Sequence, residues 1–261
     1  MNRIDAANSA EQPKLIAHRG LAADCPPNSL AAFRRAAENG FWAIETDIRK
    51  TADGRYVCIH DPVVDGMFDG SGAVSEQSFA ALRRLSYGGA WKERGSAFGP
   101  MPSLEEYLEI CAGAGCHPFI ETKTDDVPGV LEIAFRYFPE EAVVLSSIEY
   151  AHIQSAAKFS QSVFLHHIFS DVQTMQALSG RGYCGVSYNY KDWRAAPQAL
   201  LSQTHDSGVC FCLRAADTPE DFRAALALGA DYVPTNCVLP EQVRALRRTP
   251  DGTQIRSIQK H

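Results

Sequence analysis

The sequence predicts one α/β domain that folds as a closed (β/α)8 barrel, the TIM barrel, with a short irregular insertion after the second strand. Apolar strand patterns alternate with helix patterns along the chain, and about eight such units in roughly 250 residues indicate a closed parallel barrel. No linker divides the 261 residues, and their 45% hydrophobic content suits one sizeable core. We expect a flexible N-terminus at 1–13, the barrel domain at 14–248 and a polar tail at 249–261.

The expected elements follow in order along the chain. Strands are predicted in the first half of 42–61 and at 14–17, 56–59, 117–122, 143–147, 163–166, 183–187, 209–213 and 231–234. Helices are predicted at 29–39 behind an Asn28 cap, at 78–85, from the Ser103–Glu106 capping box to 112, at 130–137 and 150–158, between Thr218 and Gly229, and at 240–248. The stretch 62–102 is irregular, and its glycine-rich part at 88–99 predicts a mobile loop beside the site.

The segment 42–61 contains two carboxylates on one expected strand. Glu45 and Asp47 are two residues apart, so their side chains point to the same face. Apolar neighbours such as Ile44 and Ile48 indicate that this strand is buried, where two ionised carboxylates repel each other unless cations or donors neutralise them. Oxygen ligands suit a hard cation such as Mg²⁺ or Ca²⁺. Ion pairs with arginines are the structural alternative.

Further ionisable residues end other expected strands. In a (β/α)8 barrel the site lies where the strands end. We therefore expect one mouth to collect His18, Arg19, Glu45, Asp47, His60, Glu121 and Lys123. The carboxylates would hold a metal ion, the cations a phosphate, and the histidines would transfer protons near neutral pH. Each residue alone has a structural explanation; Lys123, for example, could extend to solvent. The remaining histidines are assigned structural or surface positions, with His166 as the strongest exception because it ends a predicted strand.

Composition narrows the partners and the compartment. The net charge of −6 argues against nucleic acid or an anionic membrane as the main partner, and no run reaches transmembrane length. The N-terminal 13 residues lack an apolar signal core, and the eight cysteines show no disulfide pattern. These features predict a cytoplasmic protein with free thiols, a small-molecule substrate and no membrane insertion. A homo-oligomer is possible.

At these residues the chain resembles the glycerophosphodiester phosphodiesterase family, and the resemblance extends from Leu15 to about Pro240. The family's motifs correspond to His18-Arg19-Gly20, Glu45-Thr46-Asp47, Thr51-Ala52-Asp53-Gly54, His60-Asp61 and Glu121-Thr122-Lys123. Each motif alone is weak, but this order and spacing are specific. The resemblance implies hydrolysis of glycerophosphodiesters to an alcohol and sn-glycerol 3-phosphate in glycerol and lipid metabolism, with one Mg²⁺ or Ca²⁺ bound.

Carried over residue by residue, the resemblance implies three kinds of role. Glu45, Asp47 and Glu121 correspond to metal ligands, His18 and His60 to the acid–base pair, and Arg19 and Lys123 to phosphate contacts. The chain departs from the family at three places: Pro-Glu-Asn-Thr is Pro26-Pro27-Asn28-Ser29, Trp-Thr is Phe211-Cys212, and Thr-Asp is Thr235-Asn236. None of these changes removes a residue with an implied role, and all bear on the head-group pocket.

Two alternatives remain open from the sequence. The chain could be another metal-dependent barrel lyase or isomerase, which would place a base beside an enolate rather than two histidines beside a phosphate. It could also bind phosphodiesters without catalysis or with another specificity, because Pro27 replaces the family's glutamate. For the hydrolase, the attacking group could be water or the substrate's own glycerol hydroxyl.

Overall fold

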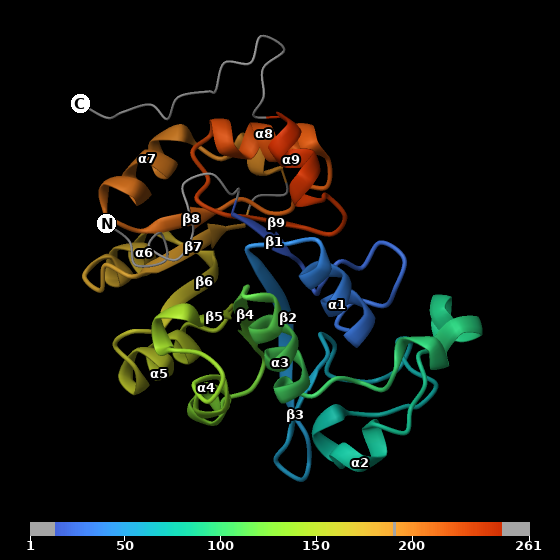
Figure 1. Cartoon of the computed structure of the whole chain (residues 1–261). Coiled ribbons are helices and arrows are strands. Elements are labelled where there is room, and N and C mark those ends of the chain that lie inside the picture. The colour runs from blue at the N-terminus through green and yellow to red at the C-terminus, as the bar shows by residue number, and fades with distance from the viewer. Residues whose placement is uncertain (1–13, 190–191, 247–261) are drawn as a thin grey trace.

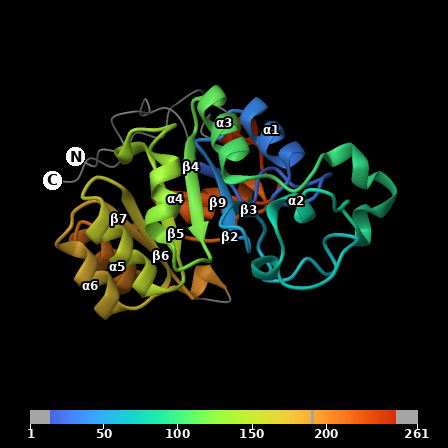
Figure 2. The same cartoon turned by 90° about the horizontal axis from the view of Figure 1, so that it is seen from below.

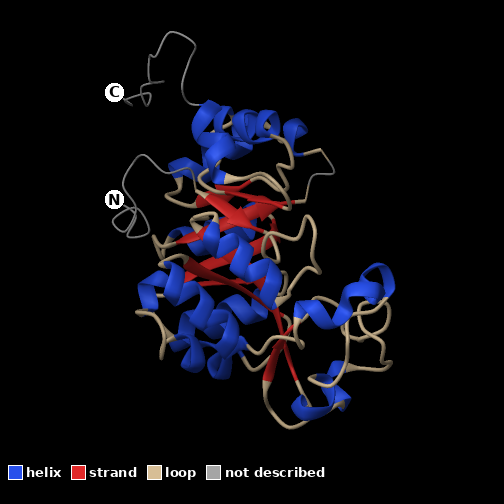
Figure 3. Cartoon of the chain, turned by 45° about the vertical axis from the view of Figure 1, so that its right-hand side comes forward, coloured by secondary structure: helices blue, strands red, loops and turns tan. Residues whose placement is uncertain are grey.

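The computed structural model describes residues 14–189 and 192–246; the expected N-terminus at 1–13, the tail at 249–261 and the end of the domain at 247–248 lie outside the described residues. Eight parallel strands form the barrel, and helices surround them (Figures 1 and 3). The strands are β1 (Leu15–Ala17), β2 (Ala43–Lys50), β4 (His117–Thr122), β5 (Val144–Ser147), β6 (Phe164–Ser170), β7 (Cys184–Tyr188), β8 (Cys210–Cys212) and β9 (Val233–Thr235). The fold class predicted from the sequence is confirmed.

The strand order makes the barrel almost closed. The ladder runs β8-β7-β6-β5-β4-β2-β1-β9, and a parallel bridge between Cys212 and Tyr232 joins its two ends. β3 (Tyr56–Cys58) lies outside this ring and pairs antiparallel with the end of β2. The turn at Asp53-Gly54 connects the two, and Gly54 has a φ of 80°, which glycine adopts without a steric penalty. β3 therefore carries the chain out of the barrel directly after the Glu45–Asp47 strand.

One helix follows most barrel strands. The α-helices are α1 (Leu30–Glu38), α2 (Phe79–Leu82), α3 (Leu104–Ala114), α4 (Val127–Ala134), α5 (Tyr150–Phe159), α6 (Val172–Ser179), α7 (Gln198–Asp206), α8 (Pro219–Ala227) and α9 (Pro240–Leu246). Short 3₁₀ helices lie at η2 (Val74–Glu76), η3 (Gly89–Phe98), η4 (Glu140–Ala142) and η5 (Trp193–Ala195). The segment with η2, α2 and η3 forms a lobe at the side of the barrel (Figure 2).

Several local expectations need correction. The N-cap of α1 is Ser29, whose hydroxyl accepts from the Ala32 N–H, so the cap predicted at Asn28 is wrong. α4 begins at Val127 behind an Asp126 cap, three residues before the predicted start. Helices α6 and α7 were not predicted. The expected loop at 88–99 is the 3₁₀ helix η3, and its Phe98 packs edge-on against Tyr87 in a small apolar cluster of the lobe.

Other local expectations are confirmed. The Ser103–Glu106 capping box opens α3 with both reciprocal hydrogen bonds present. Thr218 caps α8 and Pro219 takes its first position. Two apolar layers hold the barrel together: a large one between the strands and the helices, and a smaller one inside the barrel. The inner layer lies below the mouth and includes Trp42, Phe119, Phe164, Tyr183 and Tyr232. It closes the barrel under the polar residues at the strand ends.

Tyr232 crosses the inside of the barrel and needs a glycine opposite it. A Cβ on Gly185 would lie 2.0 Å from the Tyr232 hydroxyl oxygen and 3.2 Å from the Cys210 carbonyl. We expect Gly185→Ala to lower the free energy of unfolding by about 1–3 kcal/mol, because the inner layer cannot expand. Denaturant unfolding measures this loss. The control is Gly113→Ala on α3, where nothing lies within 4 Å of the added Cβ and a helical alanine is expected to be neutral or stabilising. Equal effects of the two variants would contradict the packing argument.

Candidate active site

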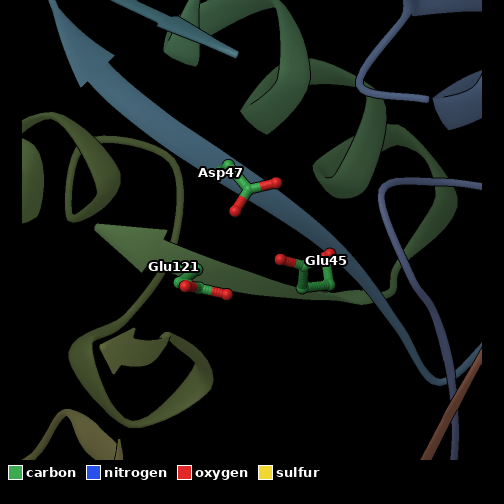
Figure 4. Close-up of side chains that lie close together, drawn as sticks. All are labelled: Glu45, Asp47 and Glu121. Atoms are coloured by element: carbon green, nitrogen blue, oxygen red, sulfur yellow. The ribbon is translucent and has the colours of Figure 1, made fainter. Parts of the chain in front are cut away.

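Three carboxylates meet at the carboxyl ends of β2 and β4. Asp47 is the register partner of Glu121, so the two side chains point into the barrel side by side. Glu45 lies two residues before Asp47 on the same face, as Figure 4 shows. One oxygen from each of the three lies within 4.8 Å of the others, and all three residues are at most 7% exposed. The strand spacing that suggested this cluster is therefore realised in three dimensions.

Burial affects the carboxylates unequally. The pKa of Glu45 is raised well above its ordinary value, first by burial and then by the charges of Asp47 and Glu121. Burial is also the largest single effect on Asp47 and raises its pKa, but the charges of Arg19 and Lys123, with the Asn28 hydrogen bond and His60, together lower it. The Arg19 Nε and the Lys123 Nζ lie 3.2 and 3.3 Å from its two oxygens, and Lys123 also contacts Glu121. The positive charges of Arg19 and Lys123 thus lie against Asp47 and Glu121, and the negative charge of Glu45 is the least neutralised of the three.

Asn28 holds the Asp47 carboxylate in place. Its amide nitrogen donates to Asp47 Oδ2 over 2.9 Å, and its carbonyl oxygen accepts from the Thr46 hydroxyl over 2.8 Å. Asn28 has a φ of 53°, in the left-handed region that asparagine tolerates better than most residues. Sequence reasoning assigned Asn28 to a helix cap and missed this role. Its position after the first strand, at the same end of the barrel as Asp47, was the available signal.

His18 directly follows β1 and is held by a residue that follows β9. Its Nδ1 lies 2.8 Å from Asn236 Oδ1. The orientation of the Asn236 amide is fixed because its Nδ2 and its backbone N–H both donate to the Asp217 carboxylate, over 2.9 and 2.8 Å. The Asn236 oxygen must accept, so His18 Nδ1 carries the proton and Nε2 keeps its lone pair. Burial lowers the pKa of His18 to about 4, so this ring is neutral at pH 7.

His60 follows β3 and lies at the more open side of the site. Its Nδ1 lies 2.7 Å from the Asp61 carboxylate, and its side chain is 42% exposed. The Ile59 N–H donates to the Asp47 carbonyl over 3.0 Å, which ties this strand end to β2. His60 is not among the residues that line the cavity at the mouth, whereas His18, Glu45 and Glu121 are. The expected residues therefore meet at one barrel end, with His60 at the rim.

The donor set fits a hard divalent cation. Glu45 Oε1 is buried and accepts no hydrogen bond from any described residue, and Asp47 Oδ1 has only the ion-pair contact with the Lys123 ammonium at 3.3 Å. These two oxygens beside Glu121 therefore keep lone pairs that a bound cation or water can use. Carboxylate oxygens without nitrogen or sulfur donors favour Mg²⁺ or Ca²⁺ over softer metals. Glu45, Asp47 and Glu121 can therefore hold a metal ion together.

The rest of the mouth contains polar residues outside the predicted site, of which only His166 was singled out from the sequence, as an exception among the structural histidines. The cavity is also lined by Ser146 on β5, His166 on β6, Ser187 on β7 and Arg214 after β8. His166 is 2% exposed and its Nδ1 lies 2.6 Å from the Tyr232 hydroxyl. The position of these residues on alternate, inward-facing sites of barrel strands is the signal that could have found them.

A TIM barrel with an acidic metal-type cluster, two cations and a neutral histidine at its mouth has the features of a metal-assisted hydrolase of phosphate esters. The comparison with family models agrees with this class. Residues 18–205 match the model of the glycerophosphoryl diester phosphodiesterase family, and the chain belongs to that family. The resemblance stated from the motifs is confirmed.

Curated relatives carry the family's name. The chain is 34% identical over 152 residues to the glycerophosphodiester phosphodiesterase of Caldanaerobacter subterraneus subsp. tengcongensis, which covers 56% of this chain and 62% of the relative. It is 35% identical over 128 residues to the mouse glycerophosphodiester phosphodiesterase 1, which covers 48% of this chain and 39% of the relative. Each match thus spans less than two thirds of the relative's length.

Solved structures share the fold over almost the whole chain. A phosphodiesterase of Oleispira antarctica, solved in complex with sn-glycerol 3-phosphate as product, superposes with a TM-score of 0.79 at 21% identity, covering 90% of this chain and 97% of that one. A putative glycerophosphoryl diester phosphodiesterase of Silicibacter pomeroyi superposes with a TM-score of 0.73 at 23% identity, covering 90% of this chain and 93% of that one.

In residues 14–189 and 192–246, no helix combines the length and the apolar character needed to cross a membrane.

His166 makes the stability of the barrel depend on pH. Burial lowers its pKa from 6.5 to about 3, so between these values the unfolded chain binds a proton that the folded chain does not. The free energy of unfolding should therefore fall with decreasing pH by about 1.4 kcal/mol per unit for this residue. His166→Gln removes that dependence and retains a partner for the Tyr232 hydroxyl.

Denaturant unfolding of both proteins between pH 4 and 6 measures the effect. We expect the stability of the variant relative to the wild type to rise steadily as the pH falls, because only the wild type loses the contribution of a neutral buried imidazole. The carboxylates titrate in both proteins and cancel in the difference. A difference that does not change with pH would contradict a buried neutral His166.

Proposed function

We propose that this protein hydrolyses glycerophosphodiesters to an alcohol and sn-glycerol 3-phosphate with the help of one bound Mg²⁺ or Ca²⁺. The observation that carries the proposal is the cluster of Glu45, Asp47 and Glu121, which shares the mouth with two cations and a neutral histidine. The family membership, the curated names of the relatives and the product complex of the Oleispira protein support the same reaction.

The chain's own residues divide the work by charge. Arg19 and Lys123 sit beside the carboxylate cluster, where a phosphodiester anion would approach, and their N–H groups can donate to its non-bridging oxygens. Glu45, Asp47 and Glu121 would hold the cation, which when bound withdraws charge from the phosphoryl oxygens. The inner apolar layer beneath them excludes water from that side of the phosphate.

The two histidines have different environments that suit different proton transfers. His18 presents an unprotonated Nε2 because Asn236 accepts the Nδ1 proton, so we assign it as the base that takes the proton of the attacking O–H group. His60 has the Asp61 carboxylate 2.7 Å from its Nδ1, and its 42% exposed side chain can exchange protons with solvent at the rim. We assign it as the acid that protonates the leaving alkoxide.

We also propose a substrate size and a compartment for the enzyme. The substrate is a small diester, and we propose a reducing cytoplasm as the site of action, because all eight cysteines lie in the described part and all are free thiols, six of them buried. The oligomeric state stays a prediction that size measurement in solution would test.

The metal site can be tested without an activity assay. Glu45 is buried and its raised pKa favours the neutral form in the metal-free protein, so Glu45→Gln should leave the metal-free stability equal or higher, within about 1 kcal/mol. A divalent ion at about 100 times its Kd should stabilise the wild type by about 2.7 kcal/mol and the variant by much less.

Thermal unfolding with and without Mg²⁺ or Ca²⁺, with calorimetric titration, measures both effects. Glu109→Gln on the exposed face of α3 is the matched control and should retain the metal-dependent shift. Chelation should abolish turnover of the wild type. An enzyme that keeps its full rate after chelation, or a Glu45→Gln protein that binds the ion as tightly as the wild type, would refute the site.

The histidine assignment predicts opposite responses to the leaving group. His18→Ala and His60→Ala should each lower kcat on a natural glycerophosphodiester by about 10²–10⁴-fold. On a nitrophenyl ester of glycerol phosphate, whose leaving group needs no proton, His60→Ala should recover much of the rate and His18→Ala should not. Single-turnover rates on both substrates measure this contrast.

Three results would change the assignment. Recovery of His18→Ala instead of His60→Ala would exchange the two roles, and a loss below tenfold in both variants would make the histidines structural. Tight binding of the diester by the wild type with metal, but no release of product, would favour the non-catalytic binder over the hydrolase.

A further inference from the structure

We propose that the wall of the mouth that runs from Ser146, beside Glu121, to Ser187 and Arg214, across from the carboxylates, is a subsite for an anionic group on the alcohol half of the diester. The anionic group is a carboxylate or a phosphomonoester. This inference rests on the proposed function, since it concerns which glycerophosphodiesters the same site accepts.

The strand order places the subsite across the mouth from the metal-type cluster. Around the closed ring, β8 is four strands from β4 in both directions, and β7 is four strands from β2. Arg214 follows β8 and therefore faces Glu121, while Ser187 on β7 faces Glu45 and Asp47. All of these residues except Asp47 line one cavity. A diester whose phosphate lies at the carboxylate cluster would extend its other end toward Arg214.

Arg214 differs from the other cations of the mouth in having no acidic partner. Arg19 and Lys123 each pair with Asp47, and Lys123 also contacts Glu121. Among residues 14–189 and 192–246, no carboxylate pairs with the Arg214 guanidinium. The guanidinium carbon instead lies over the Phe169 ring, 5.4 Å from the ring centre. A half-buried guanidinium without a counter-charge attracts an anion strongly, and its planar donors match a carboxylate or phosphate.

An irregularity in β6 brings Phe169 to Arg214. The register between β6 and β7 shifts between His167 and Ser170, and Phe169 has a φ of 57°, an uncommon value for a bulky residue. Its ring is consequently exposed at the rim, where it stacks on the guanidinium. This contact orients Arg214 without neutralising it. Strained backbone at the rim of a barrel is typical of functional sites.

Two serine hydroxyls of the same wall also lack partners. Ser146 and Ser187 are 0% exposed, and neither hydroxyl forms a hydrogen bond with a described residue. Both line the cavity, Ser146 as the register partner of Glu121 and Ser187 as that of Cys212, two residues before Arg214. Buried hydroxyls without partners are costly, so hydroxyls that face a cavity are suited to a ligand. They continue the polar wall from the cluster to Arg214.

The charge of this wall predicts a rank order of substrates. An anionic head group gains a charge-assisted hydrogen bond to Arg214, a neutral one does not, and a cationic one such as choline is repelled because no described acidic residue pairs with Arg214. Three probes that share a three-carbon alcohol isolate the charge: glycerophosphoglycerol, the corresponding diester of glycerate, and glycerophosphoglycerol phosphate. Glycerophosphocholine is the cationic probe.

Two readouts are measured on the full chain with Mg²⁺. Disappearance of each diester, followed by phosphorus NMR, gives kcat/KM, and calorimetry with a His18→Ala protein gives Kd. We expect the anionic probes to exceed glycerophosphoglycerol by about 10–100-fold in both, and glycerophosphocholine to be the weakest. The carboxylate and phosphate probes together identify which anion the site prefers.

Arg214→Gln should reduce kcat/KM for the anionic probes at least tenfold more than for glycerophosphoglycerol, and Arg214→Lys should retain part of the preference. The matched control is Arg223→Gln on the exposed face of α8, which should keep the full preference. Near-ultraviolet circular dichroism verifies that each variant is folded. The preference of the wild type tests the proposal even if a variant does not fold.

The outcomes separate the subsite from the reaction. A wild type that turns over all probes with equal kcat/KM would overturn the subsite and leave the proposed function intact. Equal losses on anionic and neutral probes in Arg214→Gln would place Arg214 at the scissile phosphate and also overturn the proposal. If no probe is hydrolysed, the proposed function fails; calorimetry then still decides the subsite, because a preference in Kd for the anionic probes supports it and equal Kd values overturn it.

Discussion

The structure of the mouth depends on three carboxylates that face one another in a buried place. Three charges at this separation are unfavourable in any folded protein unless cations and donors surround them. Much of the local structure serves this need: Arg19 and Lys123 contact Asp47, Asn28 orients it, and the Arg19 backbone N–H donates to Glu45 over 2.7 Å. The compensation is incomplete, because Glu45 Oε1 accepts no hydrogen bond from the described residues and Asp47 Oδ1 has only its ion-pair contact with Lys123. That deficit is the physical reason to place a metal ion here.

The loop between β1 and α1 carries Arg19 and Asn28, which both contact the carboxylate cluster. Arg19 and Asn28 both have positive φ values, 57° and 53°, and the Asn28 N–H donates to the Arg19 carbonyl over 2.9 Å. Gly20 between them has no room for a Cβ, which would lie 2.7 Å from the Ala32 main chain. The loop is thus fixed tightly against α1, and its strain is offset by hydrogen bonds to the carboxylates. Such a rigid loop lets one arginine hold the cluster through its backbone and through its side chain.

Patterns among residues close together in the sequence predicted the fold and the carboxylate cluster. The alternation of strands and helices predicted the barrel, and the Glu45–Asp47 spacing predicted a shared face, because both depend on residues close in sequence. The same reasoning failed where partners are distant. Asn28 looked like a helix cap because its real partner, Asp47, lies nineteen positions away in the chain. Arg214 and Ser187 meet the cluster only when the barrel closes, and their place at the inward-facing ends of strands is a weaker signal than a motif. Helices α6 and α7 are short, and burial of their apolar side chains against the strands stabilises the helical conformation more than their intrinsic helix propensity does.

The change from the family's Thr-Asp to Thr235-Asn236 is consistent with the local electrostatics. An aspartate at 236 would bring a second carboxylate into contact with Asp217, whose two oxygens now accept from the Asn236 side chain and backbone. One of two such carboxylates would have to bind a proton or lose its partner. Asparagine avoids this conflict, because its nitrogen donates to Asp217 while its oxygen accepts the Nδ1 proton of His18. It also places no negative charge beside the ring, so burial outweighs the rise in pKa that the Asn236 hydrogen bond causes, and the His18 imidazole stays neutral. The substitution thus preserves the tautomer that a base at His18 requires.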